Sequence, residues 1–252
     1  MSQFKDKTTT LTITLFIVKV VFLILIARLI QQIINIPMHI CILLVGITWN
    51  FKDKDKIKIQ SIKNQKWSGL ITLSIVIIFS ELIIYNFFYL KKYNSINLYY
   101  YNIITPIIIF QVFNCLIEEY FFRYLLFEKI KLQVLDNRKY KILISSFIFG
   151  LYHVIFLEQE VLISYYLALF IATSLAGIGL GTIYEDSSNW IYVAILHSIY
   201  NIMQNLMILN LDMDKLNINN TFIMSFYLGG LFILLSIIYR TIFYNKNKLF
   251  KS

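Results

Sequence analysis

Eight apolar runs divide the chain, and most of them are about twenty residues long. They cover residues 11–34, 36–51, 67–90, 102–128, 142–157, 161–183, 190–209 and 222–243. About twenty apolar residues in a helix span the hydrocarbon core of a bilayer, and within lipid only helices and closed barrels satisfy every backbone group. With two Pro and eight Gly in the chain, little interrupts a helix. The sequence therefore predicts an all-α, polytopic transmembrane bundle of about eight helices.

The same pattern predicts one domain. No linker between the runs is long enough to separate two domains, and no internal repeat is visible, so residues 1–252 form a single membrane domain. Pro37 separates the first two runs and fits the start of a helix. The second run is short, so it could also be re-entrant.

The net charge of +9 lies mostly in short loops between the apolar runs. Seventeen of the 23 Lys and Arg residues fall on the cytoplasmic side if the N-terminus is cytoplasmic, and three fall on the other side. This positive-inside pattern predicts a cell-membrane protein with both termini in the cytoplasm. It also explains the basic charge without a nucleic-acid partner, and the lysine-rich loop 52–66 predicts contact with anionic lipid head groups. Glu185 and Asp186 form one acidic exception, which counts little in this rule.

Three charged residues interrupt the fourth run: Glu118, Glu119 and Arg123. Each charge at that depth costs roughly 2.5–3.5 kcal/mol on insertion scales, so the default interpretation is a functional site. Glu119 and Arg123 are four residues apart, and we expect them to pair on one helix face. Glu118 points about 100° away from Glu119 and can face another group. Glu81 in the third run belongs to no motif and is interpreted as a structural or accessory group.

Two further runs carry polar residues at the same spacing. Phe149 and His153 lie four apart in the fifth run, and His197 and Asn201 lie four apart in the seventh. At about 1.5 Å of rise per residue, Glu118, His153 and His197 all fall ~10–17 Å below the cytoplasmic surface. This common depth favours one shared site.

These side chains allow two kinds of hydrolytic chemistry. Glu118, His153 and His197 could hold a metal such as zinc with an open position for water. Alternatively, a carboxylate acts as general base on water while imidazole and amide groups stabilise an oxyanion. No HExxH motif is present, which excludes the usual zincin geometry. Cys41 and Cys115 are interpreted as ordinary buried thiols.

Three motifs in order resemble those of the CPBP family, also called Abi. They are Glu118-Glu119-x-x-x-Arg123, Phe149-x-x-x-His153 and His197-x-x-x-Asn201. The family contains the CAAX prenyl endopeptidases and bacterial relatives linked to bacteriocin processing and self-immunity. The segment 177–184 and the following Trp190 are also similar, so the resemblance covers residues 110–205, about two-fifths of the chain.

The resemblance implies an eight-helix intramembrane endopeptidase that cleaves a peptide or a membrane-anchored protein near the cytoplasmic face. It implies that Glu118 activates water, that His153 lies opposite, and that His197 and Asn201 bind the oxyanion or a metal. Glu119, Arg123 and Phe149 then have supporting roles. Whether the site uses zinc or no cofactor stays open, as does the substrate.

Two other functions stay compatible with the sequence. A catalytically silent scaffold or bacteriocin self-immunity protein of the same fold would keep the motifs for structure. A transporter could use buried Glu and His side chains as a proton relay, although transporters commonly show repeats or broken helices, and neither is visible here.

Overall fold

The computed structural model describes residues 2–52, 67–85, 101–134, 137–156, 163–208 and 218–244. This part of the chain is helical and contains no strand, so the predicted all-α fold is confirmed. The elements are α1 (Ser2–Ile34), α2 (Met38–Lys52), α3 (Trp67–Tyr85), α4 (Tyr101–Glu119), the π-helical η3 (Tyr120–Leu125), α5 (Leu126–Gln133), α6 (Arg138–Ile155), α7 (Ile163–Ser187), α8 (Trp190–Ile208), α9 (Ile218–Tyr239) and the π-helical η5 (Arg240–Tyr244). Because α4, η3 and α5 follow one another without a break, the described segments form eight rods.

The helices match the eight predicted runs, and local backbone or side-chain contacts explain three of the ends that differ. α6 begins at Arg138 rather than at residue 142 because Asn137 caps it, accepting a hydrogen bond from Lys139 N at 2.9 Å. α7 continues to Ser187 and ends where Ser188 takes the left-handed conformation, with φ of 54°. Asn189 then caps α8 by accepting from Ile191 N and Tyr192 N. The lysine-rich loop 52–66 lies almost wholly outside the described residues.

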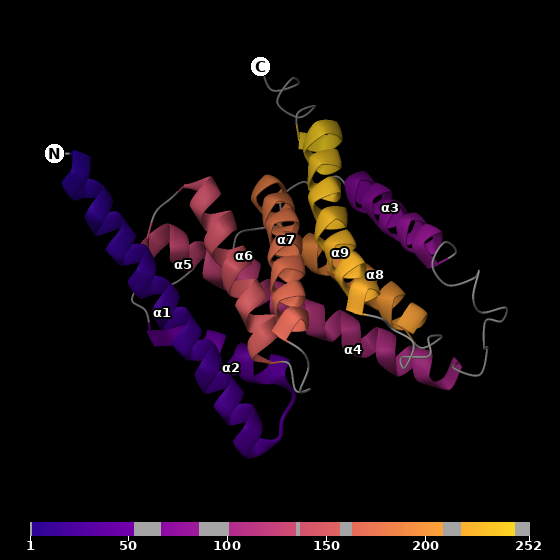
Figure 1. Cartoon of the computed structure of the whole chain (residues 1–252), viewed down its shortest axis with the longest axis horizontal. Coiled ribbons are helices and arrows are strands. Elements are labelled where there is room, and N and C mark those ends of the chain that lie inside the picture. Colours follow the sequence, from indigo (N-terminus) through magenta and orange to yellow (C-terminus); the bar gives the residue numbers. More distant parts are fainter. Residues whose placement is uncertain are drawn as a thin grey trace.

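Close packing around α7 forms the centre of the bundle. Figure 1 shows α7 between α6 and α9, and both neighbours contact it extensively. A Cβ added at Gly177 would lie 3.0 Å from Ser146 Cα on α6, and one at Gly179 would lie 2.3 Å from the Phe232 backbone on α9. Glycine is needed at these two positions because a side chain would push the neighbouring helices apart.

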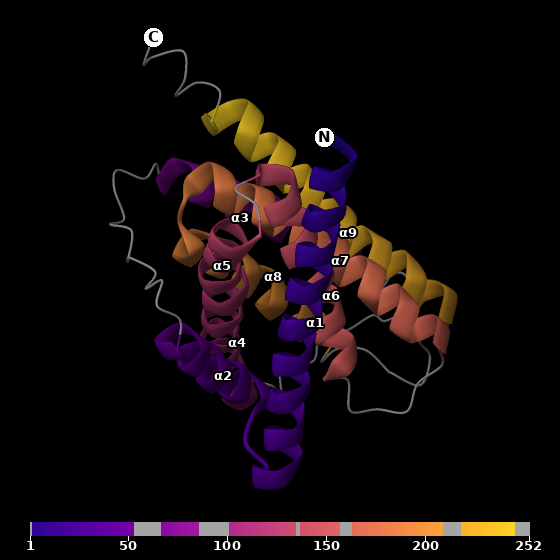
Figure 2. The same ribbon diagram turned by 90° about the vertical axis from the view of Figure 1, so that its left-hand side faces the viewer.

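The remaining helices are arranged around this centre. α4 packs against α8, α3 packs against α8 and α9, and α1 packs against α2 and α6. Figure 1 shows α1 and α2 at the left of the bundle and α3 and α9 at the right, and Figure 2 looks at the side that carries α1 and α2. This arrangement brings α4, α6, α7 and α8 around one interior region.

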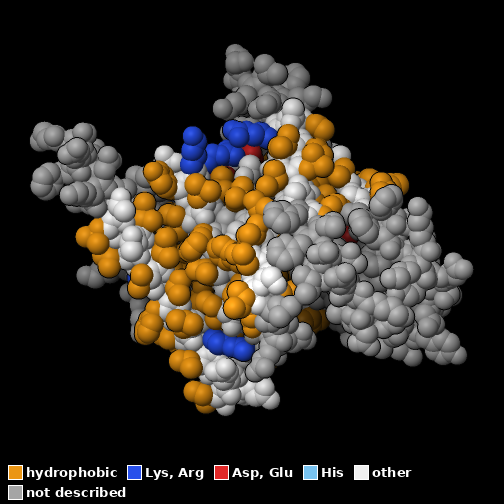
Figure 3. All heavy atoms as spheres, in the orientation of Figure 1, with side chains coloured by type: hydrophobic (Ala, Val, Ile, Leu, Met, Phe, Trp, Pro, Cys, Tyr) orange, Lys and Arg blue, Asp and Glu red, His pale blue; other side chains and the backbone are white. Residues whose placement is uncertain are grey.

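The exterior suits a lipid environment. Two helical segments are long and apolar enough to cross a membrane, Thr10–Ile34 and Ile163–Ser187, and shorter apolar helices accompany them. Large apolar side chains such as Leu15, Phe22 and Phe113 are more than half exposed. Figure 3 shows a mainly apolar face with Lys and Arg at its upper and lower edges. A bundle surrounded by hydrocarbon presents such a belt.

The acidic exception in the charge pattern has a structural explanation. Asp186 accepts a hydrogen bond from Arg138 Nη1 at 2.5 Å, and Glu185 accepts one from Lys141 Nζ at 2.8 Å. The end of α7 therefore pairs with the start of α6. Both acids counter basic residues on their own side of the bundle, so they do not contradict the predicted orientation, which itself stays a prediction.

Candidate active site

Glu118 and Glu119 end α4 and face different surroundings. Both are buried, with 2% and 0% of their surface exposed. Glu118 lines a cavity, whereas Glu119 is turned toward α8 and the π-helical segment. The 100° step between neighbouring helix positions produces this difference.

Glu119 joins two of the motifs. Its Oε2 accepts a hydrogen bond from Arg123 Nε at 2.8 Å, so the ion pair that the spacing predicts is present. Its Oε1 lies 2.8 Å from His197 Nδ1. A carboxylate accepts and cannot donate, so Nδ1 of His197 carries the hydrogen and Nε2 is left for other partners. Glu119 thereby orients His197, a role that the sequence analysis did not assign to it.

Arg123 is held by more than its ion pair. The side chain is fully buried, and its guanidinium lies 5.0 Å from the centre of the Phe149 ring, a cation–π geometry. Its Nη1 also lies 3.5 Å from Ser145 Oγ on α6. Arg123 thus connects the helix of the first motif to that of the second.

The helix changes its winding directly after the two carboxylates. Tyr120–Leu125 forms a π-helix inside the rod of α4 and α5, and Arg123 belongs to it. Such wide turns are rare in helices and frequently occur at functional sites. Here the wide turn separates the carboxylates from the close-packed residues that follow.

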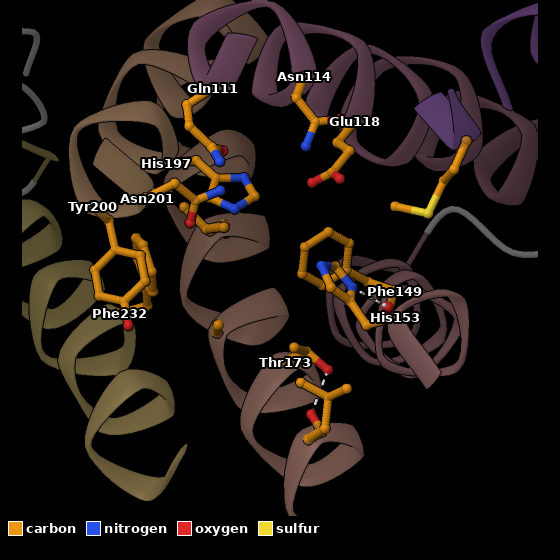
Figure 4. Close-up of a pocket in the computed structure, with 14 residues that line it drawn as sticks. Gln111, Asn114, Glu118, Phe149, His153, Thr173, His197, Tyr200, Asn201 and Phe232 are labelled. Carbon is orange, nitrogen blue, oxygen red and sulfur yellow. Dashed lines mark hydrogen bonds between the residues drawn. The ribbon is translucent and has the colours of Figure 1, made fainter. Parts of the chain in front are cut away.

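The second motif presents an oriented imidazole. His153 Nδ1 lies 2.9 Å from the Phe149 carbonyl oxygen one turn earlier. Because a carbonyl only accepts, Nδ1 carries a hydrogen and Nε2 of the neutral ring is an acceptor. The Phe149 ring packs 4.4 Å from the His153 ring, centre to centre, at 64°. Figure 4 shows both residues reaching the cavity from the side opposite Glu118.

The third motif lies on α8 beside α4. Asn201 Nδ2 donates to Cys115 Sγ at 3.3 Å, so Cys115 contacts the site, while Cys41 is an ordinary buried thiol. Cys115 precedes Glu118 by three residues, and this spacing is the signal that could have placed both on one face of α4.

One cavity of about 350 Å³ brings the motif residues together (Figure 4). Its polar lining consists of Gln111, Asn114, Glu118, His153, Thr173, His197, Tyr200 and Asn201. Its apolar lining consists of Met38, Phe149, Leu169, Ala176, Leu180 and Phe232. Every candidate catalytic residue lines this cavity, and Glu118 is its only carboxylate among the described residues. Glu119 and Arg123 lie behind the wall.

Several residues of this region carry no signal in the sequence. Gln111, Asn114 and Thr173 are single polar residues in apolar helices, and nothing separates them from ordinary core positions. The Tyr152 hydroxyl is buried near the Glu118 carboxylate, although the two do not form a hydrogen bond of standard geometry. Tyr152 is one more aromatic in a chain with 18 Tyr and 21 Phe, so it could not be singled out.

Glu81 lies outside the cavity. It is fully buried on α3 and accepts a hydrogen bond from Gln204 Nε2 on α8 at 2.7 Å. This contact joins two helices, as expected of a structural or accessory group.

The proposed metal set is not formed. Among the described residues, no group of three or more His, Cys, Asp and Glu side chains lies close enough to hold a metal ion, and this includes Glu118, His153 and His197. Nδ1 of His197 faces Glu119 and Nδ1 of His153 faces its own helix, so only Nε2 of each ring is available to a ligand. We therefore derive no step through a metal.

Comparison with known families supports the same region. Residues 100–203 match the family model described as Type II CAAX prenyl endopeptidase Rce1-like. The resemblance predicted from the three motifs is thus confirmed: residues 100–203, about two-fifths of the chain, are similar to the Rce1-like CAAX prenyl endopeptidases, and this region contains all seven motif residues. No curated protein and no solved structure matches the chain.

Proposed function

We propose that the chain is an intramembrane endopeptidase in which Glu118 activates the attacking water. The supporting observation is that Glu118 is the one carboxylate of the cavity in the described part of the chain. The neighbouring Glu119 is occupied by Arg123 and His197. One carboxylate thus remains for proton transfer.

The reaction needs a water between Glu118 and the carbonyl carbon of the scissile peptide. Glu118 takes a proton from the water while the water oxygen forms a bond to that carbon. The carbonyl oxygen then becomes an oxyanion. Glu118 then passes the proton to the leaving nitrogen, and the C–N bond breaks. His153 lies across the cavity, where Nε2 can accept the second hydrogen of the water and fix its position.

The oxyanion needs donors on α8. Asn201 lines the cavity, and its Nδ2 is a donor that contacts Cys115 Sγ. His197 can donate from Nε2 only when it carries a second proton, and the Glu119 carboxylate on Nδ1 stabilises that imidazolium. Donors fixed in advance in a site shielded from water stabilise developing charge effectively. From the family match we infer the substrate class, a membrane-associated peptide or protein. From the predicted orientation we infer cleavage near the cytoplasmic face.

The test uses purified protein in lipid vesicles and quenched fluorogenic peptides, both unmodified and ending in farnesyl-cysteine with three further residues. Wild type should cleave at least one peptide, with the new termini identified by mass spectrometry. His197→Ala should lose activity. The matched control is Ser198→Ala, the next residue, whose Oγ donates a hydrogen bond to Ala194 O of its own helix. If wild type cleaves none of the peptides, the scaffold function replaces the peptidase. If His197→Ala cleaves as fast as Ser198→Ala, the assigned site is wrong.

A further inference from the structure

The cavity has polar side chains that the proposed reaction does not use. Gln111, Asn114 and Glu118 all line it from α4, at spacings of three and four residues. These spacings place them on one face of the helix. Figure 4 shows Asn114 beside Glu118 and Gln111 further along α4, near His197. From Gln111 to Glu118 the helix rises about 10 Å at ~1.5 Å per residue.

The oxygen of the Asn114 carboxamide is unpaired among the described residues. This atom, Oδ1, is buried. Buried polar atoms are normally paired, so an exception needs an explanation. The position of Asn114 on the cavity wall is such an explanation, because a molecule that enters the cavity can bind the carboxamide.

The wall across the cavity is mainly apolar. α7 contributes Leu169, Ala176 and Leu180, and α9 contributes Phe232. No Lys or Arg is present in the described lining. The cavity therefore offers amide groups along one edge and apolar surface along another, with no Lys or Arg among its described lining residues to bind a free carboxylate.

We propose that Gln111 and Asn114 form a subsite for the main-chain amides of the substrate on one side of the scissile bond. A carboxamide carries a donor and an acceptor, as a peptide group does. An extended chain advances about 3.3 Å per residue, so the 10 Å edge matches about three substrate residues. Apolar side chains of the substrate then contact the α7 and α9 wall. This inference rests on the proposed peptidase function and adds how the substrate is held.

The test combines backbone-modified substrates with subsite variants. In a peptide that wild type cleaves, the peptide bonds flanking the scissile one are replaced by esters, one at a time. An ester lacks the N–H and has a weaker carbonyl acceptor. Wild type should lose about tenfold in kcat/KM at one flanking position, the equivalent of 1.4 kcal/mol. With the all-amide peptide, Asn114→Leu should already have a kcat/KM about tenfold below that of wild type. Introducing the ester at that position should then lower the kcat/KM of this variant by less than about twofold. In Gln111→Leu, the fall in kcat/KM caused by an ester should disappear at a different flanking position.

The matched control is Thr182→Val on α7. The Thr182 hydroxyl bonds to Ile178 O of its own helix and does not line the cavity, so this variant should keep the full ester effect. If Asn114→Leu and Gln111→Leu keep the full ester effect, or if no ester slows wild type, the subsite is overturned while the peptidase function stands. If Asn114→Leu does not fold, Gln111→Leu and Asn114→Ala provide the comparison. If wild type cleaves no peptide, the proposed function fails and the subsite fails with it.

Discussion

Glu119→Gln tests how the buried charges of the site depend on one another. The substitution keeps the shape of the side chain and removes its charge. Arg123, fully buried, then loses its ion-pair partner. The amide also cannot serve both neighbours as the carboxylate does. If the amide oxygen faces Arg123 Nε, the NH₂ group faces the hydrogen on His197 Nδ1, so two donors meet. In the other orientation the NH₂ group faces Arg123, which is also a donor.

The expected cost follows from these contacts. Removing one partner of a buried ion pair destabilises a protein by about 3–5 kcal/mol. For a chain of this size each 1 kcal/mol shifts Tm by about 2–4 °C, so Tm should fall by about 6–20 °C. Glu119→Gln combined with Arg123→Met removes both charges and should recover most of the loss.

The protein contains its own reporters for this measurement. Cys41 and Cys115 are free and fully buried, so a thiol-reactive dye labels them only on unfolding. The control is Glu185→Gln, which breaks a partly exposed pair with Lys141 and should cost about 0–1 kcal/mol. A Glu119→Gln protein that melts within about 1 °C of wild type would refute the reasoning.

Three further predictions concern the ion pair, the packing and the metal. Arg123→Ala leaves Glu119 with His197 alone, so the free energy of unfolding should fall by about 3–5 kcal/mol. The amount of folded protein in the membrane and the activity should both fall, and normal levels with normal thermal stability would contradict this. Gly179→Ala places a Cβ 2.3 Å from the Phe232 backbone and should cost about 1–3 kcal/mol, whereas Gly230→Ala meets nothing within 4 Å and should not destabilise; equal melting temperatures would show that α7 and α9 are less tightly packed than described. Chelation should leave peptide cleavage unchanged, because Glu118, His153 and His197 do not form a metal-holding group; activity lost in chelator and restored by zinc would overturn that assignment.

The fold could be predicted because length and hydropathy determine where helices cross lipid. Helix ends were less accurate where side-chain contacts decide them. The start of α6 depends on the Asn137 cap, and the end of α7 carries two acids whose basic partners lie more than 40 residues away in sequence. The π-helical turn at Tyr120–Leu125 has no hydropathy signal, so an uninterrupted α-helix was the natural expectation.

The candidate site was predictable to the extent that its residues repeat a local spacing. Four-residue spacing places Glu119 with Arg123 and Phe149 with His153, and the structure contains both contacts. The contact of Glu119 with His197 joins residues 78 positions apart, which no local pattern reveals. For the same reason the metal set could not be judged from sequence, since the distances between side chains on three different helices depend on tertiary contacts. The catalytic roles of these residues stay a proposal.

The central claim is that Glu118 is the general base, and the rate of Glu118→Gln tests it most directly. The variant keeps the shape of the side chain and exchanges a buried carboxylate for a neutral amide that cannot take a proton from water. The matched control is Glu81→Gln, the same substitution at a buried carboxylate outside the cavity. On the same peptide, with folded protein verified by melting, Glu118→Gln should lose about 10²–10⁴-fold in kcat, while Glu81→Gln should stay close to wild type. A folded Glu118→Gln protein that cleaves the peptide at the wild-type rate would contradict the account.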